Sequence, residues 1–291
     1  MAEHGKLNTA VLGAGLIGID LIERIQRSPL LHCGLVVGRD SHTRGLEKAA
    51  SMGCSTASGG IGALNESGQS FDIVFDASNA ASHAEHWAKL QSTDATLIDL
   101  TPSRIGTMVV PTINGTSTLS HRHINLVSCG GQASVPILNA LSQHYRPAYI
   151  EVVTTGASHS AGRATRLNLD EYIDTTQEAV RTFTNCEDVK VMTNLSPAKP
   201  APPFRVSMTL LVANAEADKV RSLVDAAAEE VRRFSPGFSV VSCRTDEGRI
   251  SIAVTVTATG SRIPRYAGNL GIINAAAVLL AEKRAQSRFA A

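Results

Sequence analysis

Aromatic side chains, charge of one sign and long apolar runs are all scarce in this sequence. Phe, Trp and Tyr make up 4% of the 291 residues, and the formal net charge is +1. Nucleic acids and anionic membranes require a basic excess, and bases stack on aromatic rings, so we expect neither partner. No stretch reaches the roughly 20 apolar residues of a membrane span, and the polar start of the chain lacks a secretory-signal pattern. We therefore expect a cytoplasmic protein.

Cysteine is also scarce, and no two cysteines are closely spaced. The five are Cys33, Cys54, Cys129, Cys186 and Cys243. The absence of a CxxC pair argues against a disulfide framework and a zinc site, and in a reducing compartment these residues are thiols. Hydrophobic residues make up 43% and charged residues 18%, values that are ordinary for a globular protein with a sizeable core.

The first half of the sequence alternates short apolar strands with helical patterns. This alternation is typical of βαβ units around a parallel sheet. The predicted strands are Thr9–Leu12, Leu35–Gly38, Phe71–Asp76, Thr96–Asp99 and Ile124–Ser128.

The second half has longer β-branched runs, at Tyr149–Ala157, Val206–Ala213 and Arg249–Gly260. Such runs predict antiparallel strands with one covered face. Helices are predicted from the end of the turn Cys129–Gln132 to about His144, from near Leu169 onward, over about Glu216–Phe234 and over Gly268–Arg288. The fold class is therefore α/β, with a doubly wound first half and an α+β second half.

A glycine loop, Gly13-x-Gly15-x-x-Gly18, follows the first strand and opens a helix. This is the context of a dinucleotide fingerprint, in which the glycines give a tight turn, close approach of the pyrophosphate and close helix–strand packing. After the second strand come Arg39 and Asp40. Asp40 could bind the ribose hydroxyls of NAD and Arg39 could bind the 2′-phosphate of NADP, and the sequence leaves both open.

Cys129 lies between an apolar strand and a helix, and Gly130 and Gly131 follow it. A helix start favours the thiolate, which is the nucleophile, and its backbone N–H groups can stabilise an oxyanion. The two glycines would allow close approach of a substrate. Cys129 is the predicted catalytic residue; the alternative is a structural cysteine at a helix cap.

Several other polar residues could serve a site. His83 and His86 lie three apart on a helix, but with no third ligand we predict an exposed helix face and no metal. Asp76 and Asp99 end parallel strands, where ligands collect, although a cap or turn would also explain them. His159 could act as a general base or be merely a polar loop residue.

Five segments, together with the glycine loop and in the same order, resemble the acylating acetaldehyde dehydrogenases, and the resemblance runs from about Leu7 to Ala277. Enzymes of this family accompany 4-hydroxy-2-oxovalerate aldolases in the degradation of aromatic compounds by meta-cleavage. The segments are Val74–Ser78, Ile98–Pro102, Asn125–Ala133, Ser160–Glu171 and Tyr266–Leu270.

The resemblance implies a fold like that of glyceraldehyde-3-phosphate dehydrogenase. Residues 1–128 would form a Rossmann-type dinucleotide-binding domain completed by the C-terminal helix, residues 268–291. Residues 129–267 would form an inserted α+β domain that carries catalysis and the contacts of a homodimer.

The resemblance also implies a reaction. Cys129 would attack a short-chain aldehyde, NAD (or NADP) would accept the hydride, and coenzyme A would take the acyl group from the Cys129 thioester. An aldolase partner is implied as well.

The implied cofactor contacts fall in three places. The glycine loop contributes Gly13, Ala14, Gly15, Leu16, Ile17 and Gly18. A second loop, on the nicotinamide side, contributes Ser160, Ala161, Gly162, Arg163, Ala164, Thr165, Arg166, Leu167 and Asn168. The last contact is Asn269.

The sequence departs from the family pattern at two positions of consequence. Leu16 stands where the family usually has Asn, and Val206 stands where it has the carboxylate of Asp. We therefore expect a specialised paralogue. Two rival hypotheses are a related semialdehyde dehydrogenase that uses phosphate or water, and a non-catalytic dinucleotide-binding partner subunit, which Val206 favours.

Overall fold

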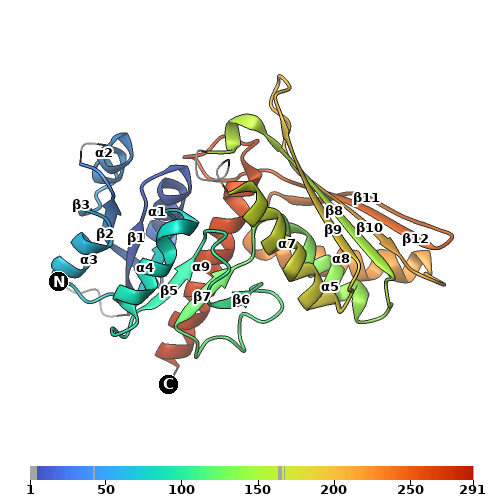
Figure 1. Cartoon of the computed structure of the whole chain (residues 1–291), viewed down its shortest axis with the longest axis horizontal. Coiled ribbons are helices and arrows are strands. Elements are labelled where there is room, and N and C mark those ends of the chain that lie inside the picture. Colours follow the sequence, from blue (N-terminus) through green and yellow to red (C-terminus); the bar gives the residue numbers. More distant parts are fainter. Residues whose placement is uncertain (1–4, 42, 163–165, 167, 291) are drawn as a thin grey trace. The chain divides into compact units, whose positions relative to one another are not determined.

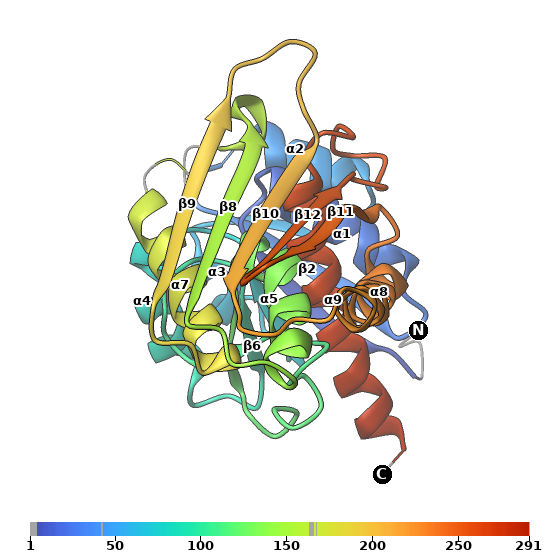
Figure 2. The same cartoon turned by 90° about the vertical axis from the view of Figure 1, so that its right-hand side faces the viewer.

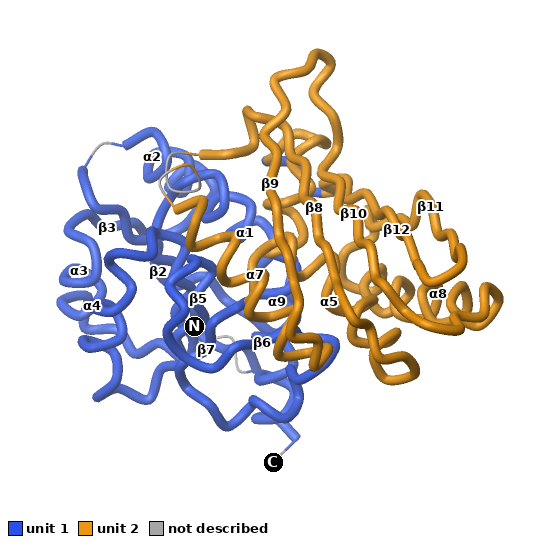
Figure 3. Tube along the Cα trace, turned by 45° about the vertical axis from the view of Figure 1, so that its right-hand side comes forward, with its two compact units in different colours: residues 1–126, 260–262, 274–291 blue, residues 127–259, 263–273 orange. Residues whose placement is uncertain are grey.

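A computed structural model describes residues 5–41, 43–162, 166 and 168–290, and the chain forms two compact units (Figure 3). Unit 1 comprises residues 1–126, 260–262 and 274–291, and unit 2 comprises residues 127–259 and 263–273. Within the described part of the chain, no helix combines the length and apolarity needed to cross a membrane.

Unit 1 is built on a seven-stranded sheet in the order β3-β2-β1-β4-β5-β7-β6, and its strand pairs are parallel (Figure 1). Because β1 pairs with both β2 and β4, the chain changes direction across the sheet beside β1, and ligands collect at such a switch point. The strands are β1 (Leu7–Leu12), β2 (Leu31–Gly38), β3 (Thr56–Ser58), β4 (Ile73–Asp76), β5 (Thr96–Asp99), β6 (Thr107–Val109) and β7 (His123–Leu126).

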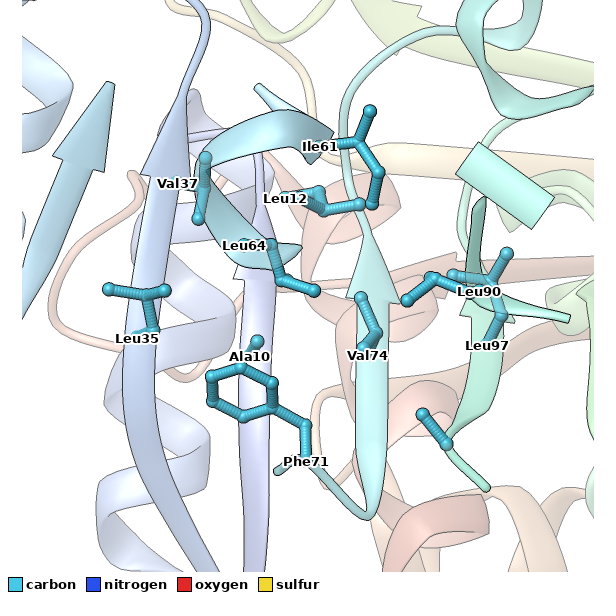
Figure 4. Packing of buried hydrophobic residues seen from close by; sticks show 11 residues of the cluster. Ala10, Leu12, Leu35, Val37, Ile61, Leu64, Phe71, Val74, Leu90 and Leu97 are labelled. Carbon is cyan, nitrogen blue, oxygen red and sulfur yellow. The ribbon is translucent and has the colours of Figure 1, made fainter. Parts of the chain in front are cut away.

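The sheet of unit 1 packs against helices through an apolar core. Figure 4 shows Leu12, Val37, Val74 and Leu97 from four adjacent strands beside Leu64 of a covering helix. Strands buried on both faces are apolar almost throughout, which is why they were predictable. The helices are α1 (Leu16–Arg27), α2 (Arg44–Ser51), α3 (Ile61–Glu66), α4 (Ala80–Leu90) and the part of α9 (Gly268–Phe289) that belongs to unit 1.

The end of the chain holds α1 in place. The Asn274 amide of α9 donates to the carbonyl oxygen of Ile17 at 3.0 Å and to Asp20 Oδ2 at 2.9 Å. Directly after α1, the Ser28 hydroxyl donates to Glu282 Oε1 at 2.6 Å. The helix behind the glycine loop is thus anchored by residues more than 250 positions away.

Unit 2 contains a five-stranded sheet in the order β11-β12-β10-β8-β9. The predicted antiparallel pairing is correct for β8, β10 and β12, but β9 runs parallel to β8. Neither β9 nor β11 was predicted. The strands are β8 (Tyr149–Ala157), β9 (Val189–Ser196), β10 (Phe204–Leu211), β11 (Phe238–Asp246) and β12 (Arg249–Val256).

One face of this second sheet is covered by helices α5 (Cys129–Ser142), α7 (Leu169–Thr184) and α8 (Ala217–Phe234). Figure 2 shows the strands side by side with α5 and α7 behind them. Along β8, Ile150 and Val152 are buried whereas Glu151 and Val153 are partly exposed, so the other face is open in a single chain. The prediction of an α/β fold with a parallel sheet and a second, α+β part is confirmed.

Candidate active site

Two of the three glycines in the glycine loop of unit 1 are required by packing, because a Cβ at either position would clash with the backbone. Gly13 has a φ of +104°, and a Cβ there would lie 2.6 Å from the carbonyl oxygen of Ala77. A Cβ on Gly18 would lie 1.9 Å from the carbonyl oxygen of Gly13. Gly15, in contrast, has nothing within 4 Å of the position that a Cβ would take, so its backbone is open to an approaching group.

Helix α1 begins at Leu16, and no side chain caps it at Gly15. An uncapped helix start carries backbone N–H donors and partial positive charge, both of which a pyrophosphate needs. Gly45 packs closely against Ala14, since a Cβ on Gly45 would lie 2.0 Å from the Ala14 carbonyl oxygen. Leu16 is 49% exposed, an unusual place for a large apolar side chain. These residues fit a dinucleotide.

Arg39 and Asp40 follow β2 directly and lie on the surface, with side chains 82% and 68% exposed. Arg39 Nε is 3.3 Å from Asp40 Oδ2. An exposed pair of this kind is weakly held, so either side chain is free to turn to a ligand. The geometry therefore does not choose between NAD and NADP.

Cys129 lies at a helix start in unit 2, as predicted, but α5 begins at Cys129 itself and includes Gly130 and Gly131, which the sequence placed before the helix. Ser128 caps the helix, because its Oγ accepts the N–H of Gly131 at 3.1 Å. The Sγ of Cys129 donates to the hydroxyl of Tyr172, from α7, at 3.5 Å, and that hydroxyl also accepts the N–H of Gly130 at 3.1 Å. The sequence analysis missed Tyr172, because the contact joins residues 43 positions apart.

Neighbouring protein atoms lie close to Gly130 and Gly131. A Cβ on Gly130 would lie 2.5 Å from Tyr172 Oη and 2.7 Å from Thr154 Cγ2, and one on Gly131 would lie 2.0 Å from Val127 Cγ1. Packing therefore explains both glycines, because protein atoms fill the place that either Cβ would take, and close approach of a substrate at these glycines stays a prediction. Gly130 is what lets the Tyr172 hydroxyl reach the start of α5.

The helix start acts on the pKa of the Cys129 thiol in the expected direction, but burial acts against it and is the larger effect. Burial raises the pKa of the Cys129 thiol to about 11, although the Tyr172 hydroxyl and the backbone N–H of Gly130 act to lower it. Desolvation of a charged sulfur thus outweighs the helix terminus in the chain alone. The pKa of Tyr172 is raised well above 10, chiefly by burial and then by the nearby sulfur.

A threonine of β8 also lies at the start of α5. Thr154, whose Cγ2 lies at Gly130, is 1% exposed, and its Oγ1 donates to Thr193 Oγ1 at 2.9 Å. On the other side, Thr154 pairs with Val206 of β10, which is fully buried. The position of the missing family carboxylate is therefore the register neighbour of Thr154.

The second predicted cofactor loop is only partly described: Arg163, Ala164, Thr165 and Leu167 lie outside the described residues. Ser160 is buried, as is Ala161, and the Ser160 hydroxyl donates to the carbonyl oxygen of Ala157 at 2.8 Å. Gly162 is exposed, and so is His159.

Arg166 is hydrogen-bonded to backbone carbonyl oxygens of the same loop. Its Nη2 donates to the carbonyl oxygen of Ser158 at 2.7 Å, and its Nε donates to that of Ala161 at 3.2 Å. Asn168 then precedes the first residue of α7 as its N-cap position, without a capping hydrogen bond from its side chain. Arg166 thus has a structural task whether or not it also contacts a cofactor.

Asn269, near the start of α9, is 8% exposed. Its Oδ1 is buried and finds no hydrogen-bond donor among the described residues. Such an orphaned acceptor costs free energy unless a ligand or water satisfies it. This supports, but does not test, the predicted cofactor contact.

The prediction of an exposed face for His83 and His86 is wrong. Both are buried, and each ring is hydrogen-bonded through Nδ1 to Asp76 Oδ2, at 2.8 and 2.7 Å. His83 also lies 3.4 Å from Asp99 Oδ1 and contacts His123 through Nε2 at 2.8 Å. Helix α4 turns these histidines toward the sheet, where they meet the strand-end carboxylates that the sequence analysis treated separately.

Charge within this buried cluster is shared among its members. Burial alone would raise the pKa of Asp76, but hydrogen bonds from His83 and His86 hold it well below its usual value. Burial raises the pKa of Asp99 to about 6. Burial would lower the pKa of His83, but the hydrogen bond to Asp76 and the charge of Asp99 raise it.

A metal ion could in principle use this cluster. Asp76, His83 and Asp99 offer donor atoms within 4.8 Å of one another, so the third ligand thought missing is present among the described residues. Ser78 satisfies Asp76, however, and Thr101 and Ser103 satisfy Asp99. The cluster is therefore saturated by protein donors, and the absence of a metal remains a prediction.

The two units together define a class: α/β proteins that join a Rossmann-type sheet and glycine loop to an α+β unit with a cysteine at a helix start. The model of the family described as prokaryotic acetaldehyde dehydrogenase, dimerisation, matches residues 129–264. The acetaldehyde dehydrogenase of Streptomyces griseus is 51% identical over 276 residues, covering 95% of this chain and 89% of the relative. That of Pectobacterium atrosepticum is 38% identical over 288 residues, covering 98% and 97%. The chain belongs to the acetaldehyde dehydrogenase family.

A solved structure is also similar over almost the whole chain. Aspartate semialdehyde dehydrogenase II from Vibrio cholerae, complexed with ASA, superposes with a TM-score of 0.66 at 14% identity, covering 96% of this chain and 98% of that one. The likeness concerns the fold alone, and it confirms the predicted glyceraldehyde-3-phosphate dehydrogenase-like arrangement.

Proposed function

We propose that this protein is an acylating aldehyde dehydrogenase that converts a short-chain aldehyde, coenzyme A and NAD(P)⁺ to acyl-CoA and NAD(P)H, reversibly, through a thioester on Cys129. The observation that carries the proposal is the setting of Sγ. The sulfur lies at the start of a buried helix, beside the Tyr172 hydroxyl and the backbone N–H of Gly130. Membership of the acetaldehyde dehydrogenase family supports the same chemistry.

The glycine loop is where the dinucleotide would bind. Gly15 leaves the backbone open, Gly13 and Gly18 shape the turn, and the uncapped start of α1 supplies positive potential for the pyrophosphate. When bound, the nicotinamide supplies the hydride acceptor. Leu16 offers an apolar contact there in place of a polar one, and Asn269 has a free acceptor for a ligand donor.

At Cys129 the chemistry divides into two steps. Sγ bonds to the aldehyde carbon and, after oxidation, holds the acyl group as a thioester, which the thiol of coenzyme A then attacks. The chain itself positions Sγ at the start of α5, beside the Tyr172 hydroxyl.

The test is intact-mass spectrometry of the protein incubated with acetyl-CoA or propionyl-CoA, without reduced cofactor. We expect a mass gain of one acyl group in the native chain and none in Cys129→Ala. The variant should still bind NAD nearly as well, because the glycine loop is in the other unit. No adduct with any short acyl-CoA would contradict the proposal and favour the non-catalytic hypothesis.

The open face of the unit 2 sheet supports a homodimer, as does the match to a dimerisation family model. The aldolase partner, the cytoplasmic location and a role in aromatic catabolism stay predictions that follow from the resemblance.

A further inference from the structure

The backbone donors at the start of α5 are already in use. The N–H of Gly130 donates to Tyr172 Oη at 3.1 Å, and the N–H of Gly131 donates to Ser128 Oγ at 3.1 Å. The N–H of Gln132 donates to the carbonyl oxygen of Ser128 at 2.8 Å. Among the described residues, none of the three N–H groups that follow the cysteine is therefore left to bind an oxygen of a substrate.

The Tyr172 hydroxyl lies where a substrate oxygen would otherwise meet the helix start. Its oxygen is 3.5 Å from Cys129 Sγ and accepts the N–H of Gly130. A phenol oxygen that accepts both the thiol hydrogen and an N–H has its own hydrogen left to donate. Because a hydrogen bond received strengthens one that is given, the Gly130 N–H also makes this hydroxyl a better donor. Burial raises the pKa of Tyr172 well above 10, so the hydroxyl keeps its hydrogen at neutral pH.

The distance of this hydroxyl from the sulfur suits a donor to a developing charge. When Sγ bonds to a carbonyl carbon, the carbonyl oxygen becomes negatively charged and lies two bonds from the sulfur. An oxyanion donor lies about 3 Å from that oxygen. A hydroxyl 3.5 Å from Sγ is placed to meet this requirement. Cys129 and Tyr172 are both partly exposed, so neither is closed off from a substrate.

A second contact fixes the helix that carries Tyr172. One turn further along α7, Thr176 is fully buried, and its Oγ1 is hydrogen-bonded at 2.6 Å to the Oγ of Ser128, the residue that caps α5. At the first contact, a Cβ on Gly130 would lie 2.5 Å from Tyr172 Oη, so the glycine is needed for the approach. The phenol is therefore positioned in advance, and a fixed donor stabilises a transition state without reorganisation.

We propose that Tyr172 is a catalytic residue whose hydroxyl donates a hydrogen bond to the oxyanion that forms when Cys129 attacks a carbonyl carbon. The proposal rests on the thioester function of Cys129. In transfer from acetyl-CoA, the Cys129 proton leaves to water, Sγ bonds to the acyl carbon, and an electron pair of the C=O bond moves to the oxygen. The pair then returns, the bond to the coenzyme A sulfur breaks, and the departing thiolate takes a proton from water. Tyr172 keeps its proton throughout, and nothing is oxidised or reduced.

Acylation and alkylation of the same sulfur separate this role from an effect on the thiol. Both reactions need the Cys129 thiolate. Attack on an acyl carbon forms an oxyanion, whereas iodoacetamide reacts at a saturated carbon and forms none. The Tyr172 hydroxyl also acts to lower the pKa of the thiol, so its loss should slow both reactions. The ratio of the two rates at one pH cancels this shared effect and reports on the oxyanion.

The experiment compares full-length Tyr172→Phe with a matched control, Tyr145→Phe. Both changes remove one phenol hydroxyl from unit 2, and the Tyr145 hydroxyl is buried without a hydrogen-bond partner in the described structure. Acylation by acetyl-CoA is followed by quenched intact-mass spectrometry, and alkylation of Cys129 by peptide mass spectrometry. Tyr172→Phe should lower the ratio of acylation to alkylation about 100-fold, the usual cost of losing one oxyanion donor, and Tyr145→Phe should leave the ratio unchanged.

A native-like ratio in Tyr172→Phe would overturn the proposal, even if both rates fell together. If that variant does not fold, 3-fluorotyrosine in place of Tyr172 keeps the shape of the side chain and makes the phenol a stronger acid. The ratio should then exceed the native one, and an unchanged ratio would equally reject an oxyanion role. If the native chain forms no acyl adduct at all, the proposed function fails, and that outcome is distinct from the failure of Tyr172 as a donor.

Discussion

At Cys129, burial raises the pKa of the thiol whereas the helix start and the Tyr172 hydroxyl lower it, and burial is the larger effect. The raised pKa, about 11, means that the thiol form dominates at neutral pH and that the thiolate fraction grows with pH. We expect the rate of Cys129 alkylation by iodoacetamide to rise about tenfold per pH unit between about pH 7 and pH 9, because only the thiolate reacts.

Peptide mass spectrometry would follow alkylation at Cys129, with the Cys129→Ala chain as the blank for the other four cysteines. A rate that levels off below about pH 8 would show that the helix start, not burial, controls the thiol, and the expectation from the sequence would then be right.

At the level of elements, local signals were predictable and long-range contacts were not. The starts of α1 and α5 follow from glycines and an apolar strand that are adjacent in sequence. Strand β11 escaped prediction because its residues are mostly half-exposed or exposed, so no apolar run marks it. Tyr172 escaped because its partner lies 43 residues away, on another helix.

Helix α4 shows the same limit most clearly. Two histidines three apart are polar, and polar spacing by itself indicates an exposed face. Their burial follows from Asp76 at the end of β4 and His123 on β7, which only the folded sheet brings together. The strand-end position of Asp76 was the available signal, but nothing in the sequence joined it to α4.

The buried cluster under α4 predicts a pH-dependent contribution to stability. The pKa of His83 is raised in the fold, so its contribution is fully present below about 6.5 and is lost as pH rises through the folded value. Asp76 has a lowered pKa, so its contribution disappears only in stronger acid. We expect His83→Gln to reduce the free energy of unfolding by about 3 kcal/mol near pH 5.5, because it leaves a buried carboxylate short of a partner, and by less near pH 8.

Urea unfolding at both pH values measures the difference, with His32→Gln as the matched control. His32 lies on the same unit but is exposed, so its loss should matter little at either pH. An equal loss at both pH values for His83→Gln would mean that the ring serves packing alone and that its charge is not involved.

On the scale of the whole molecule, the uncovered face of the unit 2 sheet argues for a second copy of the chain. The strand register places a row of four uncharged residues across the centre of this face. Val153 pairs with Met192 on one side and with Ser207 on the other, and Ser207 pairs in turn with Ala253. A sheet face without charge along its middle suits a two-fold interface, where each residue near the axis meets its own copy.

A carboxylate introduced in this row would therefore meet its own copy as well as lose water. We expect Ser207→Glu to convert the dimer to monomer at micromolar concentration, because two like charges in a buried interface cost several kcal/mol. Sedimentation velocity would measure the mass, and Ser222→Glu, the same change on the exposed surface of α8, should leave the dimer intact. A native chain that sediments as a monomer, or a Ser207→Glu chain that stays dimeric, would place the interface elsewhere.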